Sequence, residues 1–385
     1  MNKLLISSVS LGFLSLALSC SSNDDAASTP GVTAPSGEGT APTSNGSTNG
    51  ASNSPAVNGT TPNGTEQTVS PALPANPAPA VTPPAATSPE GTPPAATPPE
   101  NTAALQPALP VVANADHEQL LSSTVPALAA NKRLVYDMWR TLIEARNTQA
   151  AEQYFAEGYI QHNPNADTGR AGVLAFFASQ GAPQTVQARV QTPLVAVVAE
   201  RDYVALVQVN AQQQPRPYTT TWFDLFRIEG GLIAEHWDHG QLPDGGMPGG
   251  YVPPVVTTDQ AATLGSDSPL LAGNKQLVYD MWRTLLDAQQ VEEAPRFLAE
   301  GYIQHNPQAN TGLQGFLSFF RQFAQPQPVQ PTVANFIQII AEGDLVVLAT
   351  VRSYTAAAPY TTTWFDMFRV NEGLLVEHWD TATLQ

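Results

Sequence analysis

The chain has 385 residues with 33 acidic and 16 basic side chains, giving a formal net charge of −17. Aromatic residues are absent from positions 14–135, and no Lys or Arg occurs between Lys3 and Lys132. A stretch without aromatic side chains cannot bury enough apolar surface to offset its ordering entropy, which excludes one core spanning the whole chain. Acidic residues exceed basic ones on both sides of position 130, which argues against nucleic acid as a partner, because phosphate binding needs clustered Lys and Arg.

Residues 1–20 have the pattern of a secretory signal peptide. Lys3 precedes a largely apolar run, Leu4 to Leu18, that is too short to span a bilayer comfortably. The ending Ala17-Leu18-Ser19-Cys20 resembles a bacterial lipobox, which implies cleavage before Cys20 and lipidation of its thiol. The alternative is a secreted protein with a stray cysteine. Ser21 implies, by the same resemblance, an exported protein anchored to the cell envelope at the outer membrane.

Cys20 is the only cysteine, so the rest of the chain has neither an internal disulfide nor a thiolate metal site. Residues 21–113 are rich in Pro, Ala, Thr and Ser, a composition that favours extended polyproline II and loose coil. We therefore predict that residues 21–113 are a disordered tether that holds the remainder of the chain away from the membrane.

The remainder of the chain consists of one sequence unit written twice, at an offset of 142 or 143 residues. The matching pairs are Asn131–Leu142 with Asn274–Leu285, Ala156–Pro164 with Ala299–Pro307, Tyr218–Arg227 with Tyr360–Arg369, and Glu235–Asp238 with Glu377–Asp380. We predict a first domain at 114–242, a Gly/Pro linker at 243–268 and a second domain at 269–385, called copy 1 and copy 2 below.

Helical patterns come first in each copy and strand patterns follow. Leu134, Val135, Met138, Trp139 and Leu142 form one helical stripe. The other predicted elements of copy 1 are helices at Ala150–Phe155 and Gly172–Ser179, and strands within Val186–Ala199, Tyr203–Gln212, Tyr218–Ile228 and Leu232–Asp238. This order predicts an α+β fold with three helices packed on one face of a curved antiparallel sheet.

Three segments of copy 1 resemble those of SnoaL-like proteins of the nuclear transport factor 2-like superfamily: Tyr159–Pro164, Trp222–Arg227 and Gly231–Asp238. The resemblance extends from about Asn131 to Asp238 and from Asn274 to Asp380. It implies two tandem cone-shaped domains, each with a deep apolar pocket between sheet and helices. In catalytic members of the family, it implies acid/base chemistry on a carbonyl compound.

Four of the six histidines occupy equivalent positions in the two copies. In the last strand the period of two places His236 and Asp238 on one face, with Glu235 and Trp237 on the other. A buried carboxylate beside an imidazole can take a proton from the carbon next to a carbonyl. The resulting enolate needs a hydrogen-bond donor, which Tyr159, Gln161 or protonated His162 could supply.

The candidate catalytic residues are therefore His162, His236, Asp238, His305, His378 and Asp380. The candidate substrate-binding residues are Tyr159, Gln161, Arg170, Trp222, Asp224, Tyr302, Gln304, Trp364 and Asp366. Asp224 fits either a pocket carboxylate or the structural partner of a nearby base. Arg170 could hold an anionic substrate, and copy 2 has Leu313 in its place.

Structural interpretations of the same residues stay open. His162, followed by Asn163-Pro164, could cap a chain turn with its imidazole satisfying backbone groups, and Glu235–Asp238 could form an edge-strand ion pair with a buried Trp. His162, His236 and Asp238 could also form a facial metal triad. Because the resembled family does not usually use metals, we predict no metal and no cofactor.

Two classes of function follow from these features. The first is a cyclase or isomerase that moves protons and forms carbon–carbon bonds on a small carbonyl compound. The second is a non-catalytic module that binds a small apolar molecule or a protein. We expect a membrane contact through lipidated Cys20, and an intramolecular pseudo-dimer of the two copies favoured by their high effective concentration.

Overall fold

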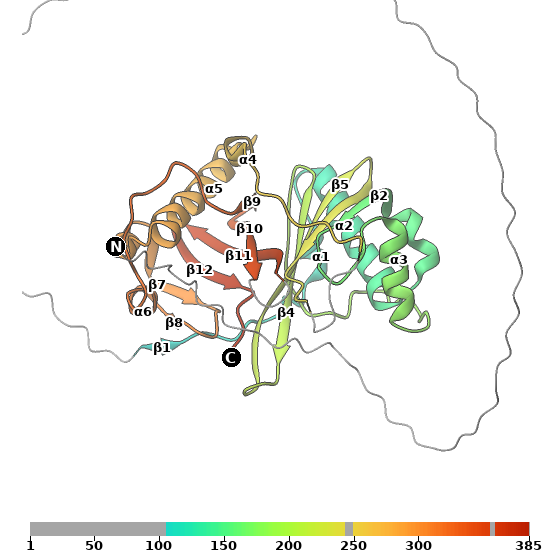
Figure 1. Ribbon diagram of the computed structural model, residues 1–385, viewed down its shortest axis with the longest axis horizontal. Helices are drawn as coiled ribbons and strands as arrows, with labels where there is room; N and C mark the ends of the chain where they lie inside the picture. Colours follow the sequence, from blue (N-terminus) through green and yellow to red (C-terminus); the bar gives the residue numbers. More distant parts are fainter. Residues whose placement is uncertain (1–104, 243–248, 355–358, 385) are drawn as a thin grey trace, which may run out of the picture. The chain divides into compact units, whose positions relative to one another are not determined.

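The computed structural model describes residues 105–242, 249–354 and 359–384, which contain two versions of the same α+β unit (Figure 1). The predicted signal peptide, Cys20 and the predicted tether up to residue 104 lie outside the described residues. Among the described residues, no helix has both the length and the apolar character needed to cross a membrane.

Both copies have the same order of elements. Copy 1 contains α1 (His117–Leu121), α2 (Pro126–Met138), a π-helical turn (Trp139–Glu144), a 3₁₀ turn (Thr148–Gln153), β2 (Phe155–Gln161), α3 (Arg170–Ser179), β3 (Leu194–Glu200), β4 (Tyr203–Gln212), β5 (Tyr218–Glu229) and β6 (Leu232–Asp238). Copy 2 contains α4 (Gln260–Leu264), α5 (Pro269–Met281), a π-helical turn (Trp282–Asp287), a 3₁₀ turn (Val291–Arg296), β7 (Leu298–Gln304), β8 (Asn310–Thr311), α6 (Leu313–Phe320), β9 (Phe336–Glu342), β10 (Leu345–Tyr354), β11 (Tyr360–Asn371) and β12 (Leu374–Asp380). The two-residue strand β1 (Gln106–Pro107) precedes both copies and pairs with β8.

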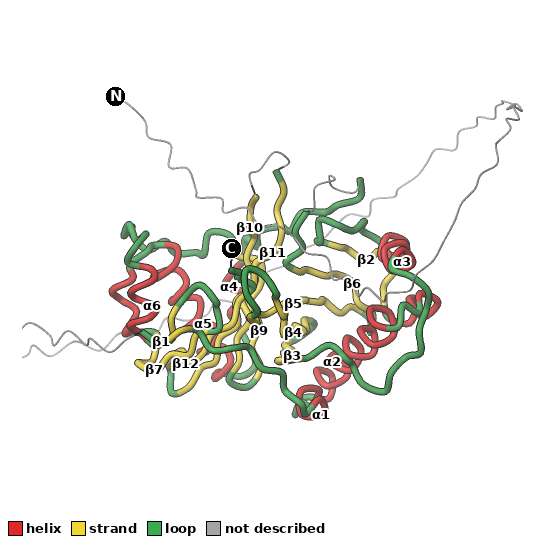
Figure 2. The backbone as a smooth tube through the Cα atoms, turned by 90° about the horizontal axis from the view of Figure 1, so that it is seen from below, coloured by secondary structure: helices red, strands yellow, loops and turns green. Residues whose placement is uncertain are grey.

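The helices of each copy cover one face of its sheet (Figures 1 and 2). Proline occupies the start of α2 and α5, where its missing N–H costs no hydrogen bond. The predicted third helix corresponds to α3. The predicted helix at Ala150–Phe155 is wrong in type and extent, because a 3₁₀ turn ends at Gln153 and Phe155 already begins a strand.

Each sheet has five strands, in the order β2-β6-β5-β4-β3 in copy 1 and β7-β12-β11-β10-β9 in copy 2. Four strands of each sheet, β3–β6 in copy 1 and β9–β12 in copy 2, form the predicted antiparallel meander. The fifth, β2 or β7, was not predicted and joins the edge in parallel with β6 or β12. Its exposed Glu157-Gly158 interrupts the apolar pattern, so the sequence lacks the alternation of a strand there.

Alternation along β5 separates two cores. Phe226 faces the helices of copy 1 with Phe155 and Val135, whereas Phe223 and Leu225 face the sheet of copy 2. The rings of Phe223 and Phe365 stack with their centroids 5.5 Å apart. Apolar side chains of both sheets thus form a third core between the copies.

Two reciprocal ion pairs cross the interface between the copies. The ammonium of Lys275 lies 2.9 Å from both carboxylate oxygens of Glu200, and that of Lys132 lies 2.6 Å from Glu342 Oε2. Each carboxylate also accepts a backbone N–H of the opposite copy. The Lys275 and Glu200 side chains are 1% and 6% exposed, whereas Glu342 is 21% exposed. The same Lys–Glu contact, formed once from each copy to the other, therefore holds the two copies together.

Two chain segments bind both copies. The first strap, residues 105–114, hydrogen-bonds copy 2 through Leu109 and then copy 1 through Asn114. The second strap, residues 249–257, hydrogen-bonds copy 1 through Gly250 and then copy 2 through Thr257. Residues 105–113 thus belong to the folded part, and the predicted tether extends too far. The predicted linker 243–268 likewise contains the second strap and α4. Neither strap was recognised in the sequence, because isolated buried apolar residues such as Val111 form no periodic pattern.

Replacing Lys275 with Met should lower the free energy of unfolding by about 3–5 kcal/mol, because Glu200 would stay buried without its cation. Lys132→Met is the matched control and should cost less, since Glu342 reaches water. Adding Glu200→Gln to Lys275→Met should restore much of the loss. Urea denaturation of the three variants measures these differences, and equal losses for Lys275→Met and Lys132→Met would contradict the interpretation.

Candidate functional site

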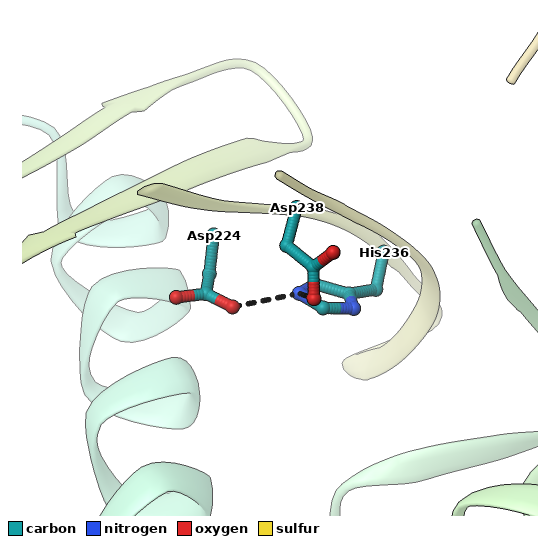
Figure 3. A group of neighbouring side chains, drawn as sticks. All are labelled: Asp224, His236 and Asp238. Carbon is teal, nitrogen blue, oxygen red and sulfur yellow. Dashed lines mark hydrogen bonds and ion pairs between the residues drawn. The ribbon is translucent and has the colours of Figure 1, made fainter. Parts of the chain in front are cut away.

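Three titratable side chains meet where the middle of β5 runs beside the end of β6, on the helix-facing side of the copy 1 sheet. Figure 3 shows Asp224 from β5 beside His236 and Asp238 from β6. His236 Nε2 lies 3.0 Å from Asp224 Oδ1 and 4.0 Å from Asp238 Oδ2. All three residues are buried. The predicted placement of His236 and Asp238 on one face is confirmed, and the carboxylate nearest the imidazole is Asp224.

Amide side chains fix every member of this cluster. Gln161 Oε1 lies 2.9 Å from His236 Nδ1, and the Gln161 amide nitrogen donates to the Tyr159 hydroxyl. Gln208 Nε2 donates to Asp224 Oδ2 at 2.7 Å. Asp238 accepts from the side-chain amide of Asn163 and from a backbone N–H. The cluster is therefore rigidly oriented before any ligand arrives.

The hydrogen bonds determine how many protons the His–Asp pair holds. Gln161 Oε1 accepts the backbone N–H of Asn163, so the oxygen faces His236 and the ring must donate from Nδ1. One further proton then lies between His236 Nε2 and Asp224 Oδ1. The pair is either imidazolium and carboxylate or imidazole and carboxylic acid, with the same total charge.

Burial governs the electrostatics of copy 1. It raises the pKa of Asp224 to about 6, although the hydrogen bond from His236 opposes the rise. For His236, burial acts to lower the pKa, but Asp224 and Asp238 together raise it above 6.5. Burial also raises the pKa of Tyr159 well above its usual range, which keeps its hydroxyl protonated. Copy 1 thus holds a proton donor and an acid/base pair in one buried place.

Copy 2 repeats the cluster with one donor missing. His378 Nε2 lies 2.9 Å from Asp366 Oδ1, His378 Nδ1 lies 2.8 Å from Gln304 Oε1, and Asn306 donates to Asp380 Oδ2. The residue in the position of Gln208 is Thr350, which leaves the second oxygen of Asp366 unpaired. Among the described residues, Asp366 Oδ2 therefore has no hydrogen-bond partner.

In copy 2, burial favours the uncharged forms of both His378 and Asp366. Burial raises the pKa of Asp366 well above its usual range and lowers that of His378 to about 4. It also raises the pKa of Asp380 to about 6. Because a donated hydrogen bond stabilises a carboxylate, the Gln208 amide favours the ionised form of Asp224, whereas Asp366 lacks this donor.

Each cluster is held in part by the opposite copy. The Thr362 hydroxyl of copy 2 donates to the backbone carbonyl of Asp238 at 3.2 Å. In the other direction, Thr220 and Thr221 donate to the carbonyl of Asp380 at 3.2 and 2.5 Å. The ends of β6 and β12 are therefore positioned across the interface.

The structure does not bring His162 and His305, two of the candidate catalytic residues, into these clusters. His162 Nε2 lies 2.9 Å from Glu235 on the opposite face of β6, and its ring stacks on Trp237. Its Nδ1 lies 2.9 Å from the Val252 carbonyl in the second strap. The structural interpretation, an imidazole that satisfies a backbone group, describes this contact.

His305 does the same for the first strap, bonding Glu377 and the carbonyl of Leu109. For Glu235 and Glu377, burial acts to raise the pKa, but hydrogen bonds from His and Arg lower it below its usual value. One nitrogen of each imidazole thus faces a carboxylate and the other faces a backbone carbonyl of a strap. These histidines fasten the straps.

Other predicted substrate-binding residues are split between the cluster and the surrounding framework. Tyr302 stacks on the His378 ring at 6.4 Å, and Gln304 holds that ring as Gln161 holds His236. Trp222 and Trp364 both approach His239, and the guanidinium of Arg352 lies 4.2 Å from the Trp364 ring. Arg170 lies outside the cluster, where its guanidinium donates to the Phe155 carbonyl and lies 3.6 Å from the Glu152 carboxylate.

The predicted alternative triad of His162, His236 and Asp238 is not assembled. By spacing, a cation could instead be held by Asp224, His236 and Asp238 or by Asp366, His378 and Asp380, whose ligand atoms lie within 4.8 Å of one another. In both groups the imidazole Nε2 already bonds a carboxylate oxygen. The arrangement is that of an acid/base pair.

Gln208 is the site residue that sequence reasoning missed. It is a single polar residue inside the apolar strand Tyr203–Gln212, and such a residue must find a buried partner. The replacement by Thr350 at the equivalent position was the available signal that the two sites differ.

Comparison with solved structures finds matches that each cover a part of this chain. A provisionally assigned polyketide cyclase from Acidithiobacillus ferrooxidans is 14% identical, with 28% of this chain covering 86% of that one and a TM-score of 0.22. A LEH-like epoxide hydrolase from Mycobacterium tuberculosis is 14% identical, with 29% and 84% covered and a TM-score of 0.23. An NTF2-like protein of unknown function from Burkholderia pseudomallei is 14% identical, with 29% and 91% covered and a TM-score of 0.23. No curated protein matches the chain.

The sequence model of the SnoaL-like domain matches residues 135–236 and again residues 279–378. Each match begins within the helix before the π-helical turn, α2 or α5, and ends at the His of the terminal strand, β6 or β12. The chain therefore belongs to the SnoaL-like domain family and carries two tandem copies of its nuclear transport factor 2-like cone.

Proposed function

We propose that the protein moves a proton on a small carbonyl compound, of the cyclase or isomerase type, at one or both His–Asp clusters. The observation that carries this proposal is the buried pair of His236 Nε2 and Asp224 Oδ1, 3.0 Å apart and sharing one proton. Burial brings the pKa of Asp224 to about 6, close to the range in which a carboxylate works as a base at neutral pH.

The chemistry needs three groups, and copy 1 supplies them. The Asp carboxylate takes the proton from the carbon beside the carbonyl, and the proton returns from the same carboxyl at a second position. The imidazole proton on Nε2 balances the charge of that carboxylate. The Tyr159 hydroxyl accepts from Gln161, which leaves its own proton free to hydrogen-bond the developing enolate oxygen.

Export and lipid anchoring belong to the same proposal. The apolar run before Cys20 and the lipobox-like sequence support cleavage and lipidation there, which would hold both copies at the cell envelope through the residues before the first strap. A substrate would then be a small molecule met outside the cytoplasm.

Proton transfer can be tested without knowing the substrate, by measuring exchange of carbonyl α-protons for deuterium in a panel of small ketones by NMR. Wild-type protein should accelerate exchange for some members. The Asp224→Asn/Asp366→Asn double variant should lose about 10²–10⁴-fold of that acceleration, because a positioned base contributes roughly this factor.

The matched control is His162→Gln/His305→Gln, which alters imidazoles on the other face of the sheet and should keep the exchange rate. If no compound exchanges faster with wild-type protein, the enzyme proposal fails and the non-catalytic binding function takes its place. If only the control variant loses exchange, His162 or His305 takes part in the proton transfer.

The dependence of stability on pH should reveal the buried carboxyl of Asp224. Its pKa is about 6 when folded and near 3.8 when unfolded, so between these values the folded state binds a proton that the unfolded state lacks. Lowering the pH from about 7 to 4 should therefore stabilise wild type relative to Asp224→Asn by about 1–3 kcal/mol. Urea denaturation across this range measures the difference. If the unfolding free energies of the two proteins change in parallel with pH, the pKa of Asp224 is not shifted.

Cys20→Ser should release the protein from the membrane fraction and abolish labelling by radioactive palmitate, since a serine hydroxyl is not the lipidated thiol. Fractionation of expressing bacteria with and without the substitution measures this. Ser21→Ala, which leaves the cysteine in place, serves as the control and should stay membrane-bound. Equal release of wild type and Cys20→Ser would refute the anchor.

A further inference from the structure

The cluster of copy 2 contains a buried acceptor that no described side chain satisfies. Asp366 is 4% exposed, and its Oδ2 has no hydrogen-bond partner among the described residues. Its other oxygen bonds His378, so the carboxyl is fixed in orientation. Buried polar atoms without partners are rare, because each one costs free energy on folding. A ligand that donates a hydrogen bond to such an atom therefore gains more binding free energy than one that displaces an existing partner.

A single residue difference between otherwise repeated networks explains the unpaired atom. In copy 1 the Gln208 amide reaches Asp224 Oδ2 at 2.7 Å, and in copy 2 the shorter Thr350 stands in its position. Trp222 and Trp364, two residues before the aspartates, each lower the pKa of their carboxyl through a side-chain hydrogen bond. They therefore do not distinguish the copies.

The chemistry of the missing partner follows from the proton count. Gln304 Oε1 accepts the backbone N–H of Asn306, so His378 donates to it from Nδ1, and the one remaining proton lies between His378 Nε2 and Asp366 Oδ1. In either protonation form, Asp366 Oδ2 is left as an acceptor. The matching ligand group is an N–H or O–H donor.

We propose that copy 2 binds a small molecule that presents an amide N–H or an alcohol O–H to Asp366 Oδ2, in the position that Gln208 occupies in copy 1. Copy 1 is closed to the same ligand by its own side chain. The inference concerns the cluster named in the proposed function but requires only binding.

Acetamide is the direct probe, because it reproduces the end of the Gln208 side chain. We would titrate it into the full-length protein labelled with ¹⁵N-histidine and follow the imidazole signals by NMR. The His378 signal should move and saturate, while the His236 signal should stay fixed because Gln208 already occupies Asp224. Methanol tests the hydroxyl donor in the same way, and acetone, which has no donor, is the negative control.

Thr350→Gln is the matched variant, since it installs the copy 1 side chain in copy 2. It should raise the melting temperature and weaken acetamide binding at His378 by at least about tenfold, because the acceptor is then satisfied internally. Gln208→Thr, the reverse change, should lower the melting temperature and make the His236 signal respond to acetamide.

The outcomes separate the two proposals. If acetamide and methanol leave His378 unmoved, or if Thr350→Gln binds as wild type does, water alone satisfies Asp366 and the inference is wrong. Binding at His378 without any exchange of carbonyl protons would refute the proposed function but not the inference. Exchange that Thr350→Gln leaves intact, together with no binding of the probes, would refute the inference but not the proposed function.

Discussion

The buried ammonium of Lys275 sets the main constraint on this molecule, because a charge with almost no access to water must meet an opposite charge. That charge, Glu200, comes from the other copy, and Lys132 with Glu342 makes the reverse contact. The two sheets therefore meet in one register, with Phe223 on Phe365 between them. The threonines that hold the ends of β6 and β12 are in place only in this register, so the same ion pairs support the geometry of both His–Asp clusters.

Within that frame the two clusters differ in how their carboxylates are stabilised. The network around His236 is complete without a ligand, since Gln208 and Asn163 satisfy both aspartates. The network around His378 lacks the Gln208 equivalent, and burial outweighs the opposing effects of Trp364 and Arg352 on the Asp366 pKa, which drives the pair toward its neutral form. One duplicated sequence thus holds a self-satisfied and an incompletely satisfied version of the same site.

Much of the fold could be predicted from sequence because its signals are local. The meander of Tyr203–Gln212, Tyr218–Ile228 and Leu232–Asp238 follows from alternation and short turns, and the period of two placed His236 with Asp238. Strand β2 and the straps could not be predicted in this way, because they are held by long-range pairing and not by their own pattern. His162 was misplaced for the same reason. Its partners, Glu235 and Val252, are distant in sequence, and its motif contains no information about them.

The exchange of the straps has a consequence for how such a protein can evolve. Each strap begins on one copy and ends on the other, so the arrangement is that of two subunits with swapped arms joined into one polypeptide. In an unlinked homodimer every substitution appears at both sites. Here the pairing is fixed by the chain itself, so a residue such as Thr350 can change in one cluster while Gln208 persists in the other. Fusion lets a symmetric architecture carry two different hydrogen-bond networks, while each cluster still relies on the opposite copy for support.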